Sequence, residues 1–328
     1  MGFTFILMSL WGATAHAFPT GLARCPDHEV NPGFQKNADL IHKAAMVGLE
    51  TRLTRKEFAQ LKRRSPRQSL KDALKEVDAR HSATGFLNCG GSWMGAILIG
   101  KNGLVTAPGH AFFNKADCSP KSQPPGAACR VMFPLTGSER TYPIKLNTVV
   151  TGYCKAQTDA NWSKYDWAVF EIEGPIAGAT PYAVPDVDSK MRDPEPGRPI
   201  KILQVAGSAV NFNSSEPRPT MKSYYNFEYC HVVDRYVHPN QPLQTDCDTG
   251  GGASGAAQLI ETDDGKIVLN AMNVAERSNL RNPENPNDSR PDSSNYVREK
   301  HYNVSVPLEG EFLRAIHEKM GTRVSSGQ

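Results

Sequence analysis

From about residue 85 onward, short apolar runs alternate with turns made of glycine, proline and asparagine. The apolar runs cover residues 96–99, 104–105, 142–150, 167–172, 200–206, 258–260, 267–272 and 302–306. Many short strands with turn residues between them and no helical period are typical of an all-β barrel or sandwich. The polar stretch 277–295, rich in proline and asparagine, is expected to be a long surface loop.

Two other parts of the chain have a helical pattern. Residues 308–320 place Phe312, Leu313 and Ile316 on one side and predict a C-terminal helix. Before residue 83 the chain is basic, and Thr54 with Glu57 has the spacing of a capping box. Ser65 at the N-cap position and Pro66 at the first helical position predict a second helix there, with an apolar stripe at residues 70, 73, 74 and 77. We expect residues 18–82 to form a helical, basic N-terminal extension or pro-segment outside the barrels.

The first residues resemble an export signal. An apolar run at 3–11 is followed by Ala15-His16-Ala17, a small-x-small cleavage site, so residues 1–17 are expected to be a signal peptide. A buried N-terminal strand is the alternative. The run is too short to span a bilayer, and no other segment approaches that length. We therefore expect a secreted or periplasmic protein that is not held in the membrane once the signal is removed.

The net charge of +3 in 328 residues is too small to indicate a nucleic-acid partner or an acidic membrane surface. The basic cluster 62–64 could be a processing site or a nucleic-acid patch, but no aromatic residues interleave with it to stack on bases. We expect no nucleic-acid binding. The sequence gives no indication of oligomeric state.

Seven cysteines suit an oxidising compartment. The sequence has no C-x-x-C and no His/Cys cluster at zinc spacing, so we expect no metal site. Cys118 and Cys129 bracket a loop and are expected to pair locally. Cys25, Cys89 and Cys154 are left unassigned, and the odd count leaves one thiol free, which we expect to be Cys25.

Three places in the chain carry candidate chemistry. Ser254 lies among four glycines within six residues, where the backbone can turn tightly and aim N–H groups in one direction. His110 lies in a small-residue turn after an apolar strand, and Asp166 comes just before another strand. Taken singly, each has an ordinary structural explanation, such as a flexible turn or a charge at a strand edge.

Taken together, the order His, Asp, Ser and the G-x-S-G context resemble the trypsin/chymotrypsin-like serine peptidases. The segments Thr106-Ala107…His110, Asp166-Trp167-Ala168-Val169 and Asp246-Cys247-Asp248-Thr249 are most similar to the bacterial branch that includes the glutamyl endopeptidases. The resemblance spans roughly residues 85–320. It implies an all-β fold with two six-stranded antiparallel β-barrels of the chymotrypsin type and a C-terminal helix, with residues 83–328 as the peptidase domain.

The resemblance also implies a role for each candidate. Ser254 would be the nucleophile, His110 its general base and then acid, and Asp166 the residue that orients His110. The backbone N–H groups of Gly252 and Ser254 would form the oxyanion hole. No cofactor is implied. We therefore expect a secreted serine endopeptidase that acts on proteins or peptides.

Asp248, Thr249, Met272 and Asn273 are the expected substrate-pocket residues. Asp248 lies six residues before Ser254, where trypsin has the acid that receives Lys or Arg. The strand 269–274 has no histidine of the kind with which glutamyl endopeptidases bind an acidic side chain. Cleavage after Lys or Arg is therefore favoured over cleavage after small or apolar residues, and a glutamyl preference is disfavoured.

The resemblance further implies a disulfide between Cys230 and Cys247, and the chain departs from the family at two places. Pro108 and Gly109 make the turn before His110 one residue longer than the usual Thr-Ala-Ala-His. Ala253 stands where trypsin has the aspartate that binds a freed N-terminus, so activation by that ion pair is not expected. Two alternatives remain open: a catalytically inactive binding module (a pseudoprotease), and a disulfide-rich adhesion or structural protein.

Overall fold

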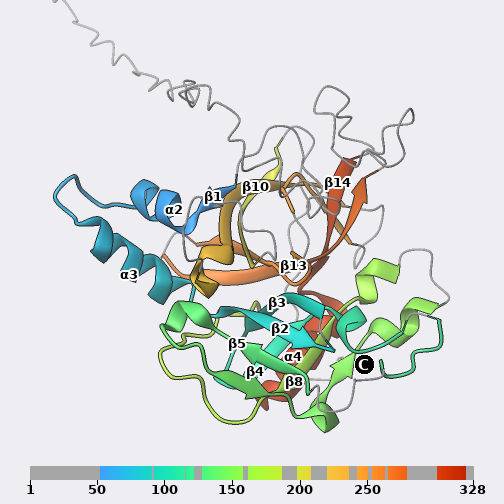
Figure 1. Cartoon of the computed structure of the whole chain (residues 1–328). Coiled ribbons are helices and arrows are strands. Elements are labelled where there is room, and N and C mark those ends of the chain that lie inside the picture. Colours follow the sequence, from blue (N-terminus) through green and yellow to red (C-terminus); the bar gives the residue numbers. More distant parts are fainter. Residues whose placement is uncertain are drawn as a thin grey trace, which may run out of the picture.

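The structure is a computed structural model that describes residues 52–90, 92–114, 116–121, 128–157, 162–186, 198–207, 220–235, 242–249, 253–262, 265–278 and 301–322. The expected signal peptide, Cys25 and most of the loop 277–295 lie outside these residues. Two antiparallel sheets lie one above the other, as Figure 1 shows, with two helices beside the upper sheet. In the described part of the chain, no helix is long and apolar enough to cross a membrane.

The N-terminal sheet is the lower one in Figure 1. In the order β6-β5-β2-β3-β4-β8-β7 it contains β6 (Thr141–Pro143), β5 (Arg130–Met132), β2 (Thr84–Cys89), β3 (Ser92–Leu98), β4 (Leu104–Ala107), β8 (Ala168–Glu171) and β7 (Val150–Thr151). An antiparallel bridge between Ile144 and Ile172 joins the ends of β6 and β8. The sheet therefore curls back on itself, but it closes through this short contact and not through a full pair of strands.

The C-terminal sheet closes completely. Its order is β1 (Leu53–Thr54), β10 (Tyr225–Arg235), β11 (Leu243–Thr245), β14 (His301–Pro307), β13 (Ile267–Ser278), β12 (Ala257–Glu261) and β9 (Ile200–Gly207). Because β9 also pairs with β10, six of these strands form a closed barrel and β1 is added at its edge. The predicted all-β architecture is thus confirmed.

Short helices fill the connections. The 3₁₀ segments are η2 (Gly109–Ala111), η3 (Pro134–Thr136), η4 (Leu146–Thr148), η5 (Tyr153–Gln157), η6 (Trp162–Tyr165) and η7 (Met221–Tyr224). The expected long strand at 142–150 is therefore wrong, because η4 interrupts it.

The predicted C-terminal helix is α4 (Gly310–Met320), and it lies on the N-terminal sheet, although the strand before it belongs to the other barrel (Figure 1). Phe312 stacks on Trp167 with ring centroids 5.1 Å apart. At the other end of α4, the Met320 side chain lies against Gly100, whose positive φ suits a glycine. The helix therefore ties the end of the chain to the first half of the fold.

The N-terminal helices are α2 (Arg55–Leu61) and α3 (Leu70–Arg80). The capping box of Thr54 and Glu57 begins α2 as predicted. The second helix begins later than expected, because Ser69 caps α3 by accepting the Asp72 N–H. The Arg63 guanidinium donates to the carbonyls of Pro66 and Gln68 and holds the intervening residues in a turn.

The helix α2 packs against the C-terminal barrel, and α3 packs against α2 and against η3 of the N-terminal half. Leu53 of β1 pairs with Phe227 of β10, and the Phe58 ring stacks on the Phe227 ring at 4.5 Å. Phe58 is completely buried. The segment from Leu53 to Arg80 is therefore packed on the fold, with β1 added at the edge of the closed barrel. Whether any of residues 18–82 is removed stays a prediction.

Three disulfides connect the described cysteines: Cys89–Cys129, Cys118–Cys154 and Cys230–Cys247. The bridge implied between Cys230 and Cys247 is present. The expected local pair of Cys118 with Cys129 is wrong. Cys129 precedes β5 and faces Cys89 on the neighbouring β2, whereas the turn that carries Cys118 folds toward η5.

Candidate active site

His110 and Asp166 meet because of the pairing of two strands. β4 and β8 are antiparallel neighbours, and Ala107 at the end of β4 lies opposite Ala168 at the start of β8. His110 follows β4 and Asp166 precedes β8, so both residues emerge at the same edge of the sheet. The pairing is reinforced by the Thr106 hydroxyl, which donates to the Ala168 carbonyl at 2.8 Å.

Both oxygens of the Asp166 carboxylate bind His110. The His110 backbone N–H donates to Oδ1 at 2.8 Å, and the ring Nδ1 lies 2.7 Å from Oδ2. Asp166 is fully buried, whereas the His110 side chain is 27% exposed. A buried carboxylate requires hydrogen-bond donors, so Nδ1 carries the proton and Nε2 is free to accept one. This is the tautomer that a general base needs.

The longer turn before His110 does not displace the histidine from Asp166. Gly109 lies where a Cβ would come within 2.6 Å of the Tyr153 Cβ and 2.9 Å of the Thr151 Oγ1. The additional residue is taken up by a 3₁₀ turn in which Phe112 N–H donates to the Gly109 carbonyl. Only glycine fits at this point, which accounts for its place beside the histidine.

Ser254 occupies a tight turn between β11 and β12. Gly255 has φ +88°, and its N–H donates to the Asn273 carbonyl at 2.7 Å. The Ser254 carbonyl accepts the N–H of Gly95 at 2.6 Å, and its hydroxyl donates to the Val274 carbonyl at 3.4 Å. The turn is therefore fixed from both sides, while within the described residues the hydroxyl makes one long hydrogen bond.

The contact with Gly95 brings Ser254 to the sheet that carries His110. Gly95 is on β3, and β3 pairs with β4, the strand that leads into the histidine turn. Among the described residues no hydrogen bond joins Ser254 to His110. Gly252, the other expected oxyanion-hole residue, lies outside the described part of the chain.

Three of the expected pocket residues, Asp248, Thr249 and Asn273, are buried polar residues of the C-terminal half. Asp248 is fully buried, and its N–H donates to the Glu228 Oε2 at 2.8 Å. The Thr249 hydroxyl donates to Asn303 Oδ1 at 3.0 Å. The Asn273 side-chain amide lies 3.4 Å from the Ala253 carbonyl, beside the nucleophile turn.

Met272 does not join this group. Its side chain is fully buried in the hydrophobic core. Successive residues of a strand point to opposite faces, so the side chains of Met272 and Asn273 point in different directions. Their role in a substrate pocket stays a prediction.

Comparisons with known proteins agree with the likeness suggested by the motifs. Neither a protein-family model nor a curated protein matches the sequence. Among solved structures, a thermostable serine protease from an extremophilic microorganism matches with TM-score 0.49 and 11% identity over 75% of this chain and all of that one. A Glu endopeptidase in complex with MPD matches with TM-score 0.50 and 15% identity, over 74% of this chain and 91% of that chain. The chain has the chymotrypsin-type fold. At this identity the likeness establishes the fold and not the reaction.

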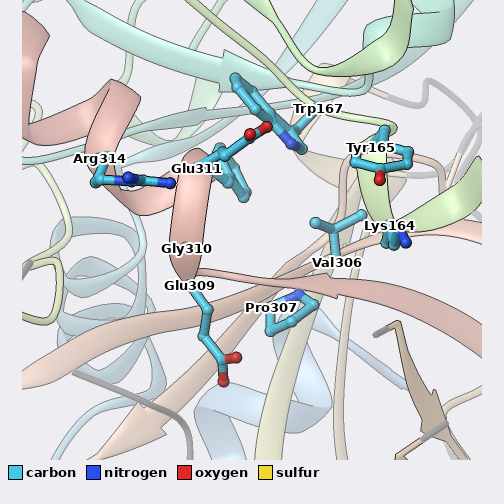
Figure 2. Close-up of a pocket in the computed structure, with 10 residues that line it drawn as sticks. Lys164, Tyr165, Trp167, Val306, Pro307, Glu309, Gly310, Glu311 and Arg314 are labelled. Carbon is cyan, nitrogen blue, oxygen red and sulfur yellow. The ribbon is translucent and has the colours of Figure 1, made fainter. Parts of the chain in front are cut away.

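In this chymotrypsin-type fold, a cavity of about 340 Å³ lies between the end of η6 and the first turn of α4, next to the residues that flank Asp166 in the sequence. Figure 2 shows Tyr165 and Trp167, the neighbours of Asp166, facing it from one side and Arg314 and Glu311 of α4 from the other. None of the three expected catalytic residues lines it. The cavity therefore borders the site without containing it.

Two residues that bind the backbone of the expected pocket residue Asp248 belong to no motif in the sequence. Glu228 and Gln204 both bind the backbone of Asp248, at 2.8 and 2.9 Å, and come from β10 and β9. Only the closure of the barrel reveals that these strands lie beside the Asp248 loop. Within the described residues, no group of three or more His, Cys, Asp or Glu side chains could hold a metal ion.

Proposed function

We propose that the protein is an exported serine endopeptidase that cuts proteins or peptides through an acyl-enzyme. The observation that carries the proposal is the double contact between His110 and the buried Asp166, with the glycine-rich Ser254 turn packed on the same sheet. The chymotrypsin-type fold supports a peptidase, since a Glu endopeptidase is among the solved structures that match it.

In this mechanism His110 Nε2 takes the proton of the Ser254 hydroxyl while Oγ bonds to the carbonyl carbon of the substrate. The resulting oxyanion is stabilised by the N–H groups of Ser254 and Gly252. When the peptide C–N bond breaks, His110 gives its proton to the leaving amine. A water molecule then repeats the sequence on the acyl-enzyme and releases the acid. Asp166 holds the ring tautomer and balances the imidazolium charge.

Export is supported by the expected signal peptide and by three disulfides within the described residues. Disulfides persist in the oxidising compartments outside the cytoplasm.

The test combines labelling and hydrolysis. The exported protein is treated with a fluorophosphonate probe, and hydrolysis of casein and of a peptide library is measured for the wild type, Ser254→Ala and His110→Ala. We expect labelling and hydrolysis in the wild type, and a loss of kcat on the order of 10⁶-fold in each variant. Ser254→Thr, which retains a hydroxyl, serves as the matched control for folding.

Two outcomes would contradict the proposal. A folded wild type that neither labels nor hydrolyses any substrate would favour the inactive binding module. Labelling that persists in Ser254→Ala would place the nucleophile at another residue.

A further inference from the structure

Three buried polar side chains lie in one row across neighbouring strands of the C-terminal barrel. In the strand register, Gln204 of β9 stands opposite Glu228 of β10 on one side and Gln258 of β12 on the other. Residues directly opposite each other in an antiparallel pair lie on the same face of the sheet, and none of the three is more than 2% exposed. Because buried polar groups are hydrogen-bonded, the partners of this row show what it holds.

Gln204 uses both ends of its amide on residues that flank Ser254 in the sequence. Its Nε2 donates to the carbonyl of Asp248, six residues before the serine, at 2.9 Å. Its Oε1 accepts the Nε2 of Gln258, four residues after the serine, at 3.1 Å. One buried side chain therefore connects the chain before the expected nucleophile to the strand after it.

The other backbone groups around Asp248 are bound by side chains of further strands. The Asp248 N–H donates to Glu228 Oε2 at 2.8 Å. Asn303 of β14 is fully buried; its Nδ2 donates to the Cys247 carbonyl, and its Oδ1 accepts the Thr249 hydroxyl at 3.0 Å. Asp248 and its two neighbours are thus held by side chains of β9, β10 and β14.

These side chains matter because Cys247 and Asp248 belong to no strand. They follow β11 and precede β12, so no ladder of backbone hydrogen bonds fixes them. The position of this loop depends instead on the Gln204, Glu228 and Asn303 side chains.

We propose that Gln204, together with Asn303, is a positioning residue that fixes the Asp248 loop relative to Ser254. This inference rests on the proposed function, in which the loop carries the expected acid for Lys or Arg and leads to the nucleophile. Without the Gln204 amide, the Asp248 carbonyl loses its buried donor and the loop can shift away from the serine.

Kinetics of a matched pair of variants test the role of Gln204. Gln204→Met removes both hydrogen bonds with little change of volume, and kcat/KM should fall by about 10- to 100-fold, as for a small misplacement of a functional group. Asn226→Leu is the control, because Asn226 is also buried in this barrel and, within the described residues, its side chain has no hydrogen bond to the Asp248 loop. It should keep kcat/KM in its folded fraction. Equal values for the two variants would overturn the proposal.

A double variant tests whether Gln258 acts through Gln204. Gln258→Met removes the same hydrogen bond from the other side. The double variant Gln204→Met/Gln258→Met should therefore be about as active as Gln204→Met alone, since residues in one network are not additive. Losses that multiply would show two independent effects and would contradict the connection through Gln204.

Hydrogen exchange separates this inference from the proposed function. The Asp248 N–H is bonded to Glu228, which Gln204→Met and Asn303→Leu both leave in place. If the two amides hold the loop, this N–H should exchange at least about 10-fold faster in either variant, and not in Asn226→Leu, even if the wild type hydrolyses nothing. NMR under native conditions measures it. Unchanged exchange in both variants would overturn the inference and leave the proposed function standing, and Asn303→Leu keeps the test available if Gln204→Met does not fold.

Discussion

Gly95 and Gly255 are packed backbone to backbone across the junction of the two sheets. A Cβ on Gly95 would lie 2.3 Å from the Gly255 carbonyl oxygen, and a Cβ on Gly255 would lie 2.2 Å from the Gly95 carbonyl oxygen. Neither residue can carry a side chain without moving the turn that contains Ser254. The position of the expected nucleophile therefore depends on a glycine in the other half of the molecule.

Gly95→Ala is expected to reduce kcat/KM by at least about 100-fold, because the Ser254 turn must move by a substantial part of an ångström. Gly85→Ala is a matched control. It introduces an equally close contact, 2.4 Å from the Met132 carbonyl oxygen, but inside the N-terminal sheet. Both variants should lose stability in chemical unfolding, and only Gly95→Ala should lose activity per folded molecule. Equal specific activities would contradict this account of Gly95.

A chain that begins at Ser82 is expected to fold poorly. It lacks Phe58, which stacks on Phe227, and the buried Asp78, which binds Arg55 at 2.5 Å and Lys222 at 2.7 Å. Phe58→Ala alone should cost about 3–5 kcal/mol of unfolding free energy. Leu61→Ala, at a residue 60% exposed on the same helix, should cost little. A chain starting at Ser82 with native thermal stability would show that the helices are dispensable.

Acid is expected to destabilise the protein through His81. Burial, with the nearby charges of Arg80 and Lys62, lowers the pKa of His81 from 6.5 to about 3. As pH falls, His81 is protonated in the unfolded chain at a higher pH than in the folded chain. The contribution of neutral His81 to the free energy of unfolding is therefore complete above pH 6.5 and is lost between about 6.5 and 3. The slope is at most about 1.4 kcal/mol per pH unit. His81→Leu should flatten this slope in urea unfolding from pH 7 to 4. Identical slopes would show that another group is responsible.

Cleavage after Lys or Arg is expected to depend on Asp248. Asp248→Ser should reduce cleavage at these residues by at least about 100-fold in a peptide library, because the cation would lose its partner. Asp246→Ser is the matched control, since Asp246 belongs to the same loop but binds His231. Cleavage after Lys or Arg with an unchanged profile in Asp248→Ser would show that Asp248 has only a structural role.

The sequence predicts best what depends on neighbouring residues or on a motif. The capping box of Thr54 and Glu57 and the C-terminal helix need only local contacts, and both are present. His110 and Asp166 could be paired from the resemblance alone. The start of α3 could not be predicted, because Ser65 and Ser69 are both good N-caps and the contacts of the Arg63 side chain decide between them.

Contacts between residues far apart in the sequence could not be predicted. The partner of Cys118 depends on how its turn folds toward η5, which no spacing in the sequence reveals.

The stack of Phe312 on Trp167 also joins two distant parts of the sequence next to the expected active site. Trp167 follows Asp166 directly, whereas Phe312 belongs to α4. A substitution in α4 that removes this ring would therefore reach Asp166 through one intervening residue.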